Sequence, residues 1–354
     1  MIYYILYEIL DINVFKYITF RGFLALLTSF AIVYLISPKI INFLAKLQNK
    51  KGGYRRKYTP DTHEAKKNTP TMGGVIILIS VLITSLIWCN INNIYVITVL
   101  FTFLTFGFIG VIDDYLKIKY KSGLSSRSKF FMQVSTAIVS SSILIINNFD
   151  TAIYFPIFKD LSFDLGVIFI LWAVFIIVGT SNAVNLTDGL DGLAIGISSI
   201  VIATFVVLSY ISGHYELANY LHLPYIKDSG ELSVFLMALL GAGLGFLWFN
   251  SYPAQIFMGD AGSLSIGASI ATVALITKQE FTLAIVGAIF VWETISVILQ
   301  VAYFKATGGK RLFLRAPIHH HYELKGIPET KIVIRKWIIT ILLAIIALAL
   351  IKIR

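Results

Sequence analysis

Long uninterrupted runs of apolar residues recur along the chain, separated by shorter polar stretches. A helix needs about 20 mostly apolar residues to cross a bilayer. The runs are continuous rather than alternating, which is typical of spanning helices and not of β-barrel strands. We therefore predict an all-α polytopic membrane protein, with residues 1–354 forming one transmembrane domain. Its ten expected spans lie at 22–43, 72–90, 94–112, 130–148, 165–184, 190–211, 232–250, 261–277, 281–304 and 332–351.

The composition agrees with this pattern, and the distribution of charge predicts how the spans are oriented in the membrane. Hydrophobic residues make up 57% of the chain and charged residues 14%. The connections 44–71, 113–129 and 305–331 hold 19 of the 29 lysines and arginines. Basic connections stay on the cytoplasmic side. We therefore expect these segments in the cytoplasm and both termini on the opposite side of the membrane.

The net charge of +10 is then mainly a topology signal. Basic loops can also attract anionic membrane lipid, and no nucleic-acid binding is expected.

Five polar clusters fall on the predicted cytoplasmic connections. Ionisable groups at membrane depth are costly and usually functional. Acidic residues on the opposite connections are scattered, without pairs or neighbouring glycines. The clusters therefore predict one functional site at the cytoplasmic ends of the helices. They are Lys66–Gly74, the pair Asp113-Asp114, Asn185–Gly192, Asn250–Gly262 and Pro317–Glu323.

Each cluster also has a purely structural interpretation. The aspartate pair could be a solvated helix end, and residues 188–192 could be a tight turn. The histidine run at 319–321 could be a metal tract or a polar loop. The glycines of 241–245 lie inside an apolar run, which favours close helix packing over a nucleotide loop.

Carboxylates without a cysteine ligand suit a hard cation, above all Mg²⁺ bound together with substrate phosphates. Zinc is the alternative that the three histidines favour. A phosphate substrate also needs cations to offset developing charge. Phe257 could stack on a nucleotide base or pack against the membrane. The available cations are Lys66, Lys67, Lys121 and Lys129.

The motifs together resemble one family. The chain is similar to the bacterial phospho-N-acetylmuramoyl-pentapeptide transferases (translocase I), members of the polyprenyl-phosphate sugar-phosphate transferase superfamily. The aspartate motifs are shared across that superfamily, and HHHYELKG points to this member. The resemblance rests on NTPTMGG at 68–74, the pair at 113–114, NAVNLTDGLDGLA at 182–194, GFLWFNSYPAQIFMGD at 245–260 and APIHHHYELKG at 316–326.

The resemblance implies an Mg²⁺-dependent homodimer with ten spans, located in the inner (cytoplasmic) membrane of a bacterium with both termini in the periplasm. Its reaction moves phospho-MurNAc-pentapeptide from UDP-MurNAc-pentapeptide to undecaprenyl phosphate, giving lipid I and UMP. Asp260 is the expected metal ligand, with Asp113, Asp114 and Asp188 as further candidates. The catalytic residues it implies are Asp113, Asp114, Asp260 and His319. The substrate-binding residues it implies are Lys66, Lys67, Thr71, Lys121, Lys129, Asn185, Asp188, Gly189, Asp191, Asn250, Phe257, His320 and His321.

A chemical argument modifies the role of Asp113. A phosphate monoester has a second pKa near 6, so the lipid phosphate is already mostly a dianion at pH 7. We therefore expect Asp113 to act through positioning and its electric field more than through proton removal.

Two rival functions remain open from sequence. A sister enzyme that uses UDP-GlcNAc shares the aspartates, but the histidine stretch disfavours it. A secondary transporter would carry acids near the midplane, whereas here they lie at span ends. Glu293 and Gln300 interrupt the apolar run 281–304, which predicts a bent or tilted span that opens a groove for a polyprenyl tail.

Overall fold

The computed structural model describes residues 4–49, 69–155 and 161–353. Within these ranges, nine helices are long and apolar enough to cross a membrane. A tenth apolar helix, α2 (Gly74–Trp88), is shorter. These ten helices correspond to the ten expected spans. The nine long ones are α1 (Ile18–Asn49), α3 (Ile94–Tyr120), α4 (Ser126–Ile146), α5 (Phe169–Thr187), α6 (Leu193–Ser212), α8 (Leu232–Asn250), α9 (Gly259–Ile276), α11 (Ala288–Ala306) and α13 (Glu329–Ile353).

Short elements fill the connections. Strands β1 (Ala152–Tyr154) and β2 (Ser162–Asp164) form an antiparallel hairpin. The hydropathy pattern did not predict this hairpin or the short helices, because a few residues carry no measurable periodicity. The short helices are η1 (Tyr4–Ile9), η2 (Asn13–Lys16), η4 (Gly166–Ile168), α7 (Tyr215–Tyr220), η5 (Ser229–Glu231), α10 (Glu280–Val286) and α12 (Ile318–Leu324).

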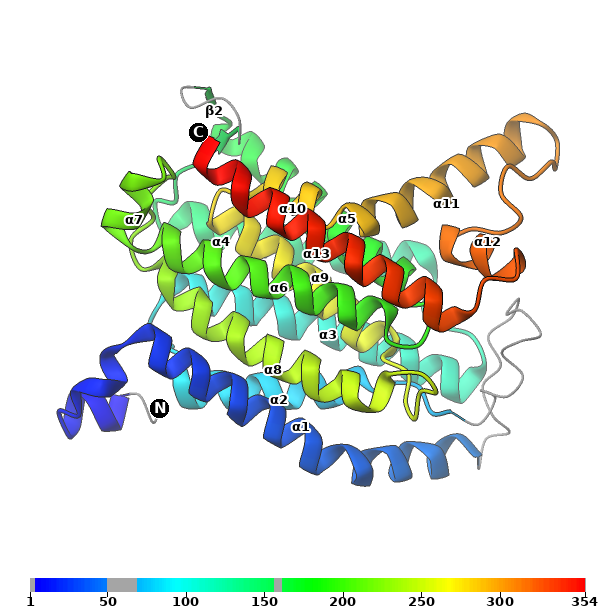
Figure 1. The fold of residues 1–354 in the computed structure, drawn as a ribbon, viewed down its shortest axis with the longest axis horizontal. Helices are drawn as coiled ribbons and strands as arrows, with labels where there is room; N and C mark the ends of the chain where they lie inside the picture. The colour runs from blue at the N-terminus through cyan, green and yellow to red at the C-terminus, as the bar shows by residue number, and fades with distance from the viewer. Residues whose placement is uncertain (1–3, 50–68, 156–160, 354) are drawn as a thin grey trace.

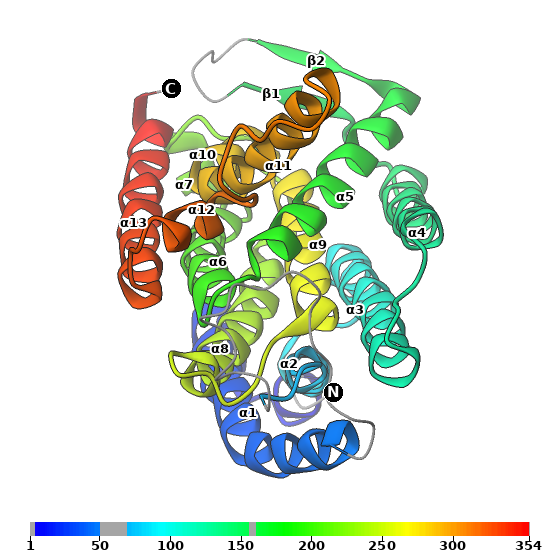
Figure 2. The ribbon, with the colours of Figure 1, turned by 90° about the vertical axis from the view of Figure 1, so that its right-hand side faces the viewer.

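The helices run side by side, with both chain termini at one end of the bundle (Figure 1). The connections that follow α3, α5, α8 and α11 gather at the opposite end, which faces the viewer in Figure 2. We call this second end the site end. These motif-bearing connections therefore lie at the end of the bundle opposite the termini.

Helix α9 forms the centre of the bundle, and all of its residues are buried. Glycines allow the neighbouring backbones to approach it. A Cβ on Gly110 of α3 would lie 2.3 Å from the carbonyl oxygen of Asp260. A Cβ on Gly74 of α2 would lie 2.0 Å from the amide nitrogen of Gly262. The amino-terminal turn of α9 is therefore held tightly between α2 and α3.

The glycines of 241–245 serve the same purpose in α8. A Cβ on Gly241 would lie 2.1 Å from the carbonyl oxygen of Leu26 in α1. The sequence-based interpretation as close helix packing is confirmed.

Helix α3 corrects one predicted boundary. The helix continues to Tyr120, so the aspartate pair lies inside it, about two turns before its end, rather than closing the span. Asp113 and Lys117 form an (i, i+4) ion pair of 2.6 Å, a spacing that stabilises helices. Lys117 and Lys119 in the last turn also favour helix continuation through the helix dipole.

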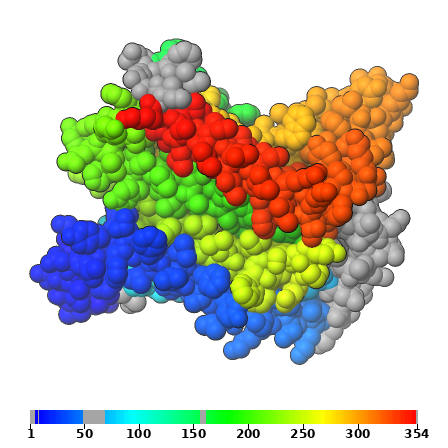
Figure 3. All heavy atoms as spheres, viewed as in Figure 1, coloured from blue at the N-terminus to red at the C-terminus, as the bar shows by residue number. Residues whose placement is uncertain are grey.

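The expected irregularity in span 281–304 is confirmed. Gly287 separates α10 from α11, and a glycine is a common cause of a helix break. Helix α11 leans away from the bundle (Figure 1), and the space-filling view shows a hollow between it and α13 (Figure 3).

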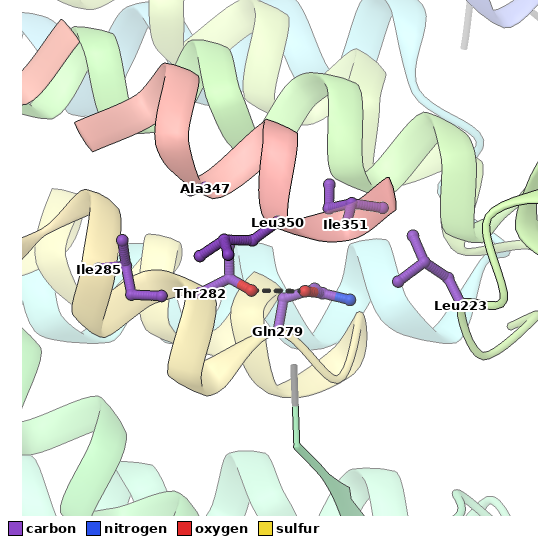
Figure 4. Close-up of a pocket in the computed structure, with 7 residues that line it drawn as sticks. All are labelled: Leu223, Gln279, Thr282, Ile285, Ala347, Leu350 and Ile351. Carbon is purple, nitrogen blue, oxygen red and sulfur yellow. Dashed lines mark hydrogen bonds between the residues drawn. The ribbon is translucent and has the colours of Figure 1, made fainter. Parts of the chain in front are cut away.

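At the end opposite the site end, Lys278 anchors the β-hairpin. Its Nζ donates hydrogen bonds to the carbonyl oxygens of Asp150 and Ala152, and burial lowers its pKa to about 8. The adjacent cavity is about 10 Å³, room for about one water and no larger ligand. Figure 4 shows the residues that line it: Leu223, Gln279, Thr282, Ile285, Ala347, Leu350 and Ile351.

Candidate active site

Three carboxylates meet at the site end. Asp113 and Asp114 come from α3, and Asp260 comes from the first turn of α9. Their ligand oxygens all lie within 4.8 Å of one another, and all three residues are buried. The contact between Gly110 and the backbone of Asp260 brings the two helices close enough for this cluster to form. We call it the carboxylate cluster.

Lys117, one turn beyond Asp113 on α3, bridges the carboxylate cluster. Its Nζ lies 2.6 Å from Asp113 Oδ2, 3.5 Å from Asp114 Oδ1 and 3.0 Å from Asp260 Oδ2. The sequence analysis counted Lys117 as a topology signal and missed it as a site residue. The (i, i+4) spacing from Asp113 was the signal that could have identified it.

Lys129 reaches the cluster from the first turn of α4. Its Nζ hydrogen-bonds to Asp260 Oδ2 and lies 3.8 Å from Asp113 Oδ2. The connection between α3 and α4 also folds onto Asp113, whose Oδ1 accepts a 2.6 Å hydrogen bond from the Leu124 amide. Lys121, by contrast, is exposed at the end of α3. The structure thus brings one of these two predicted lysines to the acids.

The amino-terminal end of α9 adds further polar contacts. The Ala261 amide donates to Asp114 Oδ2 over 3.1 Å. Asn185 Nδ2, in the last turn of α5, donates to Asp260 Oδ1 over 3.0 Å and to Ser263 Oγ over 2.8 Å. Asp260 therefore presents one oxygen to Asn185 and the other to the two lysines.

His319 lies beside the turn that follows α5. It is fully buried in α12, and its Nδ1 lies 3.0 Å from Glu293 Oε2. A Cβ on Gly189 would lie 2.1 Å from His319 Nε2, so the ring edge is packed against this turn. Asp188 caps α5 immediately before it and is half-buried. Asp188 is not part of the carboxylate cluster.

Asp191 and Asn250 connect two loops. Asp191 Oδ2 accepts a 3.0 Å hydrogen bond from the Ala254 amide. Asn250 Oδ1 accepts from the Gly192 amide over 3.0 Å, and its Nδ2 donates to the Ile256 carbonyl over 2.8 Å. Both side chains are buried. Their visible role is to hold the 188–192 turn against residues 250–258.

Replacing Asn250 by alanine should therefore lower stability by about 2 kcal/mol, because it leaves the buried Gly192 amide and Ile256 carbonyl without partners. Thermal unfolding of the purified protein measures this change. Asn250→Asp is the comparison variant: it keeps the acceptor for Gly192, but its second oxygen is charged and faces the Ile256 carbonyl. Equal melting temperatures for the parent and Asn250→Ala would contradict this assignment.

The segment 69–74 lies along the same loop. The Phe257 amide donates to the Pro70 carbonyl over 2.8 Å, and the Gly73 amide donates to the Phe257 carbonyl over 2.9 Å. Thr71 exchanges hydrogen bonds with the Gln48 side chain of α1. Thr71 and Phe257 are both half-buried. Lys66 and Lys67 lie outside the described residues.

The other two histidines have local partners in the described structure. His320 Nδ1 lies 2.6 Å from Glu323 Oε2, yet burial lowers the pKa of His320 to about 4. His320 is therefore neutral at pH 7. His321 Nδ1 accepts from the Leu314 amide over 3.1 Å. The histidines do not converge on a shared metal position among the described residues.

The donor set of the carboxylate cluster fits a hard cation. Its ligand atoms are carboxylate oxygens, without histidine or cysteine, as Mg²⁺ prefers and unlike most zinc sites. Three carboxylates facing two lysines leave one formal negative charge, which a divalent cation would offset. The described residues thus favour the hard cation over the zinc alternative.

The fold and this site define a class: a multi-pass helical membrane protein with an acidic, lysine-bridged cluster at one end of its bundle. Comparison with known proteins assigns the chain to a family within this class. Glycosyl transferase family 4 matches residues 96–278, which include the carboxylate cluster and its lysines. The phospho-N-acetylmuramoyl-pentapeptide-transferase signature 1 matches residues 66–78.

Relatives over the full length specify the family. The phospho-N-acetylmuramoyl-pentapeptide-transferase of Aquifex aeolicus is 57% identical over 97% of this chain and 96% of its own length. That of Thermodesulfovibrio yellowstonii is 52% identical over the whole of both chains, and that of a Hydrogenobaculum species is 49% identical. The chain belongs to the phospho-N-acetylmuramoyl-pentapeptide-transferase family.

Proposed function

We propose that this protein transfers phospho-MurNAc-pentapeptide from UDP-MurNAc-pentapeptide to undecaprenyl phosphate, releasing UMP and forming lipid I for peptidoglycan synthesis. The carboxylate cluster with Lys117 and Lys129 carries this proposal, because it places acids and cations together where a phosphate could bind. Family membership names the substrates.

The membrane position follows from charge. We place the site end in the cytoplasm and both termini in the periplasm, since the described parts of the basic connections 44–71, 113–129 and 305–331 lie at the site end. A soluble nucleotide and a lipid in the inner leaflet can both reach a site at this interface. This supports a bacterial inner-membrane location, with the chain acting as a single transmembrane domain in a homodimer.

For the metal we propose Mg²⁺, held by Asp260 with Asp113 and Asp114. When bound, it would supply positive charge that offsets the negative charge developing on the phosphates and on the departing UMP. The protein's own side chains bind and orient the phosphates. Lys117 and Lys129 attract the phosphates, and the fixed carboxylates orient the lysines.

The lipid tail has an apolar path along α11. Its Val301 and Phe304 are exposed and line a cavity of about 480 Å³, together with Arg311 and Arg315.

We propose that Phe257, half-buried beside the 69–74 segment, stacks on the uracil ring.

The decisive experiment measures UMP release by the purified protein. UDP-MurNAc-pentapeptide with undecaprenyl phosphate and Mg²⁺ should give UMP and lipid I, and chelation should stop the reaction. UDP-GlcNAc is the matched donor for the sister activity and should give no product. Release of UMP from UDP-GlcNAc alone would reassign the protein, and solute transport without UMP would favour the transporter.

Lys117→Met tests how the cluster balances charge. Removing the bridging ammonium makes the net charge of the carboxylate cluster and its lysines more negative. We therefore expect half-maximal activity at a lower Mg²⁺ concentration, with kcat reduced by about 10²-fold because a phosphate-binding cation is lost. A Mg²⁺ titration of initial rates measures both effects. Lys119→Met is the control, since Lys119 is exposed on the same helix. An unchanged half-maximal Mg²⁺ concentration would contradict the inference that the Lys117 ammonium weakens Mg²⁺ binding to the carboxylates.

A further inference from the structure

Glu293, His319 and Lys336 form a second buried ionic group outside the carboxylate cluster. Glu293 of α11 and His319 of α12 are fully buried, and Lys336 of α13 is nearly so. Glu293 Oε2 lies 3.0 Å from His319 Nδ1, and Lys336 Nζ hydrogen-bonds to Glu293 Oε1. The three consecutive helices α11, α12 and α13 thus meet at the Glu293 carboxylate.

This arrangement determines the state of the histidine ring. A carboxylate paired with an ammonium is ionised and can only accept hydrogen bonds. The proton that Glu293 accepts must therefore be on His319 Nδ1, which leaves the lone pair of a neutral ring on Nε2. Glu293 Oε2 also lies 3.4 Å from the His319 amide nitrogen. One carboxylate thus restrains both the ring and the backbone of His319.

The opposite edge of the ring faces the candidate active site. His319 Nε2 is packed against Gly189, where a Cβ would approach to 2.1 Å. Gly189 follows the last turn of α5, whose Asn185 donates to Asp260. The line from Lys336 through Glu293 and His319 therefore ends at the same turn that connects to the carboxylate cluster.

We propose that Glu293 is a positioning residue for the transfer reaction. It holds His319 in the tautomer with the proton on Nδ1, so that Nε2 faces the 188–189 turn, and Lys336 keeps Glu293 ionised. This proposal rests on the proposed function, in which the reaction takes place at the carboxylate cluster that α5 connects to this turn. In enzymes, a carboxylate that hydrogen-bonds one ring nitrogen of a histidine fixes the orientation and tautomer of the ring.

A purely structural role is the alternative. A buried ion pair between α11 and α13 links two helices, and removal of one partner leaves an uncompensated charge that destabilises the fold. Single substitutions therefore do not separate the two roles. Both charges must be removed together.

The test compares two double variants in which both charges are absent. Glu293→Gln with Lys336→Met keeps an oxygen that accepts from His319 Nδ1. Glu293→Met with Lys336→Met has similar volume and no acceptor. If Glu293 positions His319, kcat of the second variant should be lower by about 10-fold or more, with KM changed less than about threefold. Their melting temperatures should be similar.

Equal kcat values for the two double variants would overturn the proposal and leave the group a structural link. Gly189→Ala gives a second measure, because its Cβ displaces the His319 ring without touching Glu293. It should lower kcat in the same way, and full activity would likewise contradict the proposal.

The imidazole ¹⁵N shifts of His319 keep this inference separate from the proposed function. They are assigned by comparison with His319→Asn, and they report the Nδ1–H tautomer whether or not UMP is released. A parent protein with this tautomer but no UMP release would disprove the proposed function alone. A parent protein that releases UMP with the proton on Nε2 would disprove the positioning role alone.

Discussion

Asp260→Asn should reduce kcat for UMP release by at least about 10³-fold, the largest effect expected for a single substitution in this protein. Asparagine has nearly the same size, so Gly110 and the first turn of α9 are not disturbed. The substitution removes the charge that faces both Lys117 and Lys129. It also removes an ionised oxygen from the proposed Mg²⁺ site.

The measurement pairs initial rates with a Mg²⁺ titration. The half-saturating Mg²⁺ concentration should rise, in the direction opposite to that expected for Lys117→Met. Asp228→Asn is the matched control, since Asp228 is exposed, lies outside the cluster and uses only its backbone carbonyl to bind Asn93. Activity of Asp260→Asn above about a tenth of the parent's would contradict the metal assignment.

Sequence predicted the spans well because membrane helices obey a strong local rule. Each span needs a long apolar run. The alternation of basic connections predicts which helix ends share one side of the membrane. The end of α3 departs from this rule, because Asp113 and Lys117 neutralise each other inside the helix and allow it to continue. Local hydropathy does not register such a pair, so the predicted span ended too early.

The partners of the site residues could not be predicted in the same way. Asp113 and Asp260 are far apart in the chain, and only the close contact at Gly110 makes them neighbours. Glu293 and Lys336 are likewise paired by the packing of α11 against α12 and α13. Sequence marked Glu293 as an interruption of an apolar run. The helix instead breaks at Gly287, and the sequence pattern gave no sign of the contact between Glu293 and His319.

The motif around 188–192 shows a related difference. The resemblance placed Asp188, Asp191 and Asn250 together among the substrate-binding residues. The structure gives Asp191 and Asn250 backbone partners that fix the loops. Residues of one motif can therefore support a loop through tertiary hydrogen bonds, and the local sequence does not reveal these hydrogen bonds.

Asp113→Asn should lower kcat by about 10²-fold, and raising the pH should not restore the activity. Asp113 Oδ1 accepts from the Leu124 amide, and its Oδ2 contacts Lys117. In the variant, an amide nitrogen placed toward Lys117 would set two donors against each other and displace that lysine. The loss is then one of orientation and charge, which solvent hydroxide cannot replace.

The pH–rate profile from about pH 6 to 10 separates this role from proton removal. The lipid phosphate has a second pKa near 6 and is mostly dianionic above pH 7. If Asp113 only positions groups, the variant and the parent should keep parallel profiles over this range. If Asp113 removes a proton, the variant should regain most of its activity as hydroxide takes over that task. Such recovery would make Asp113 the base, because no change of pH returns the missing charge beside Lys117.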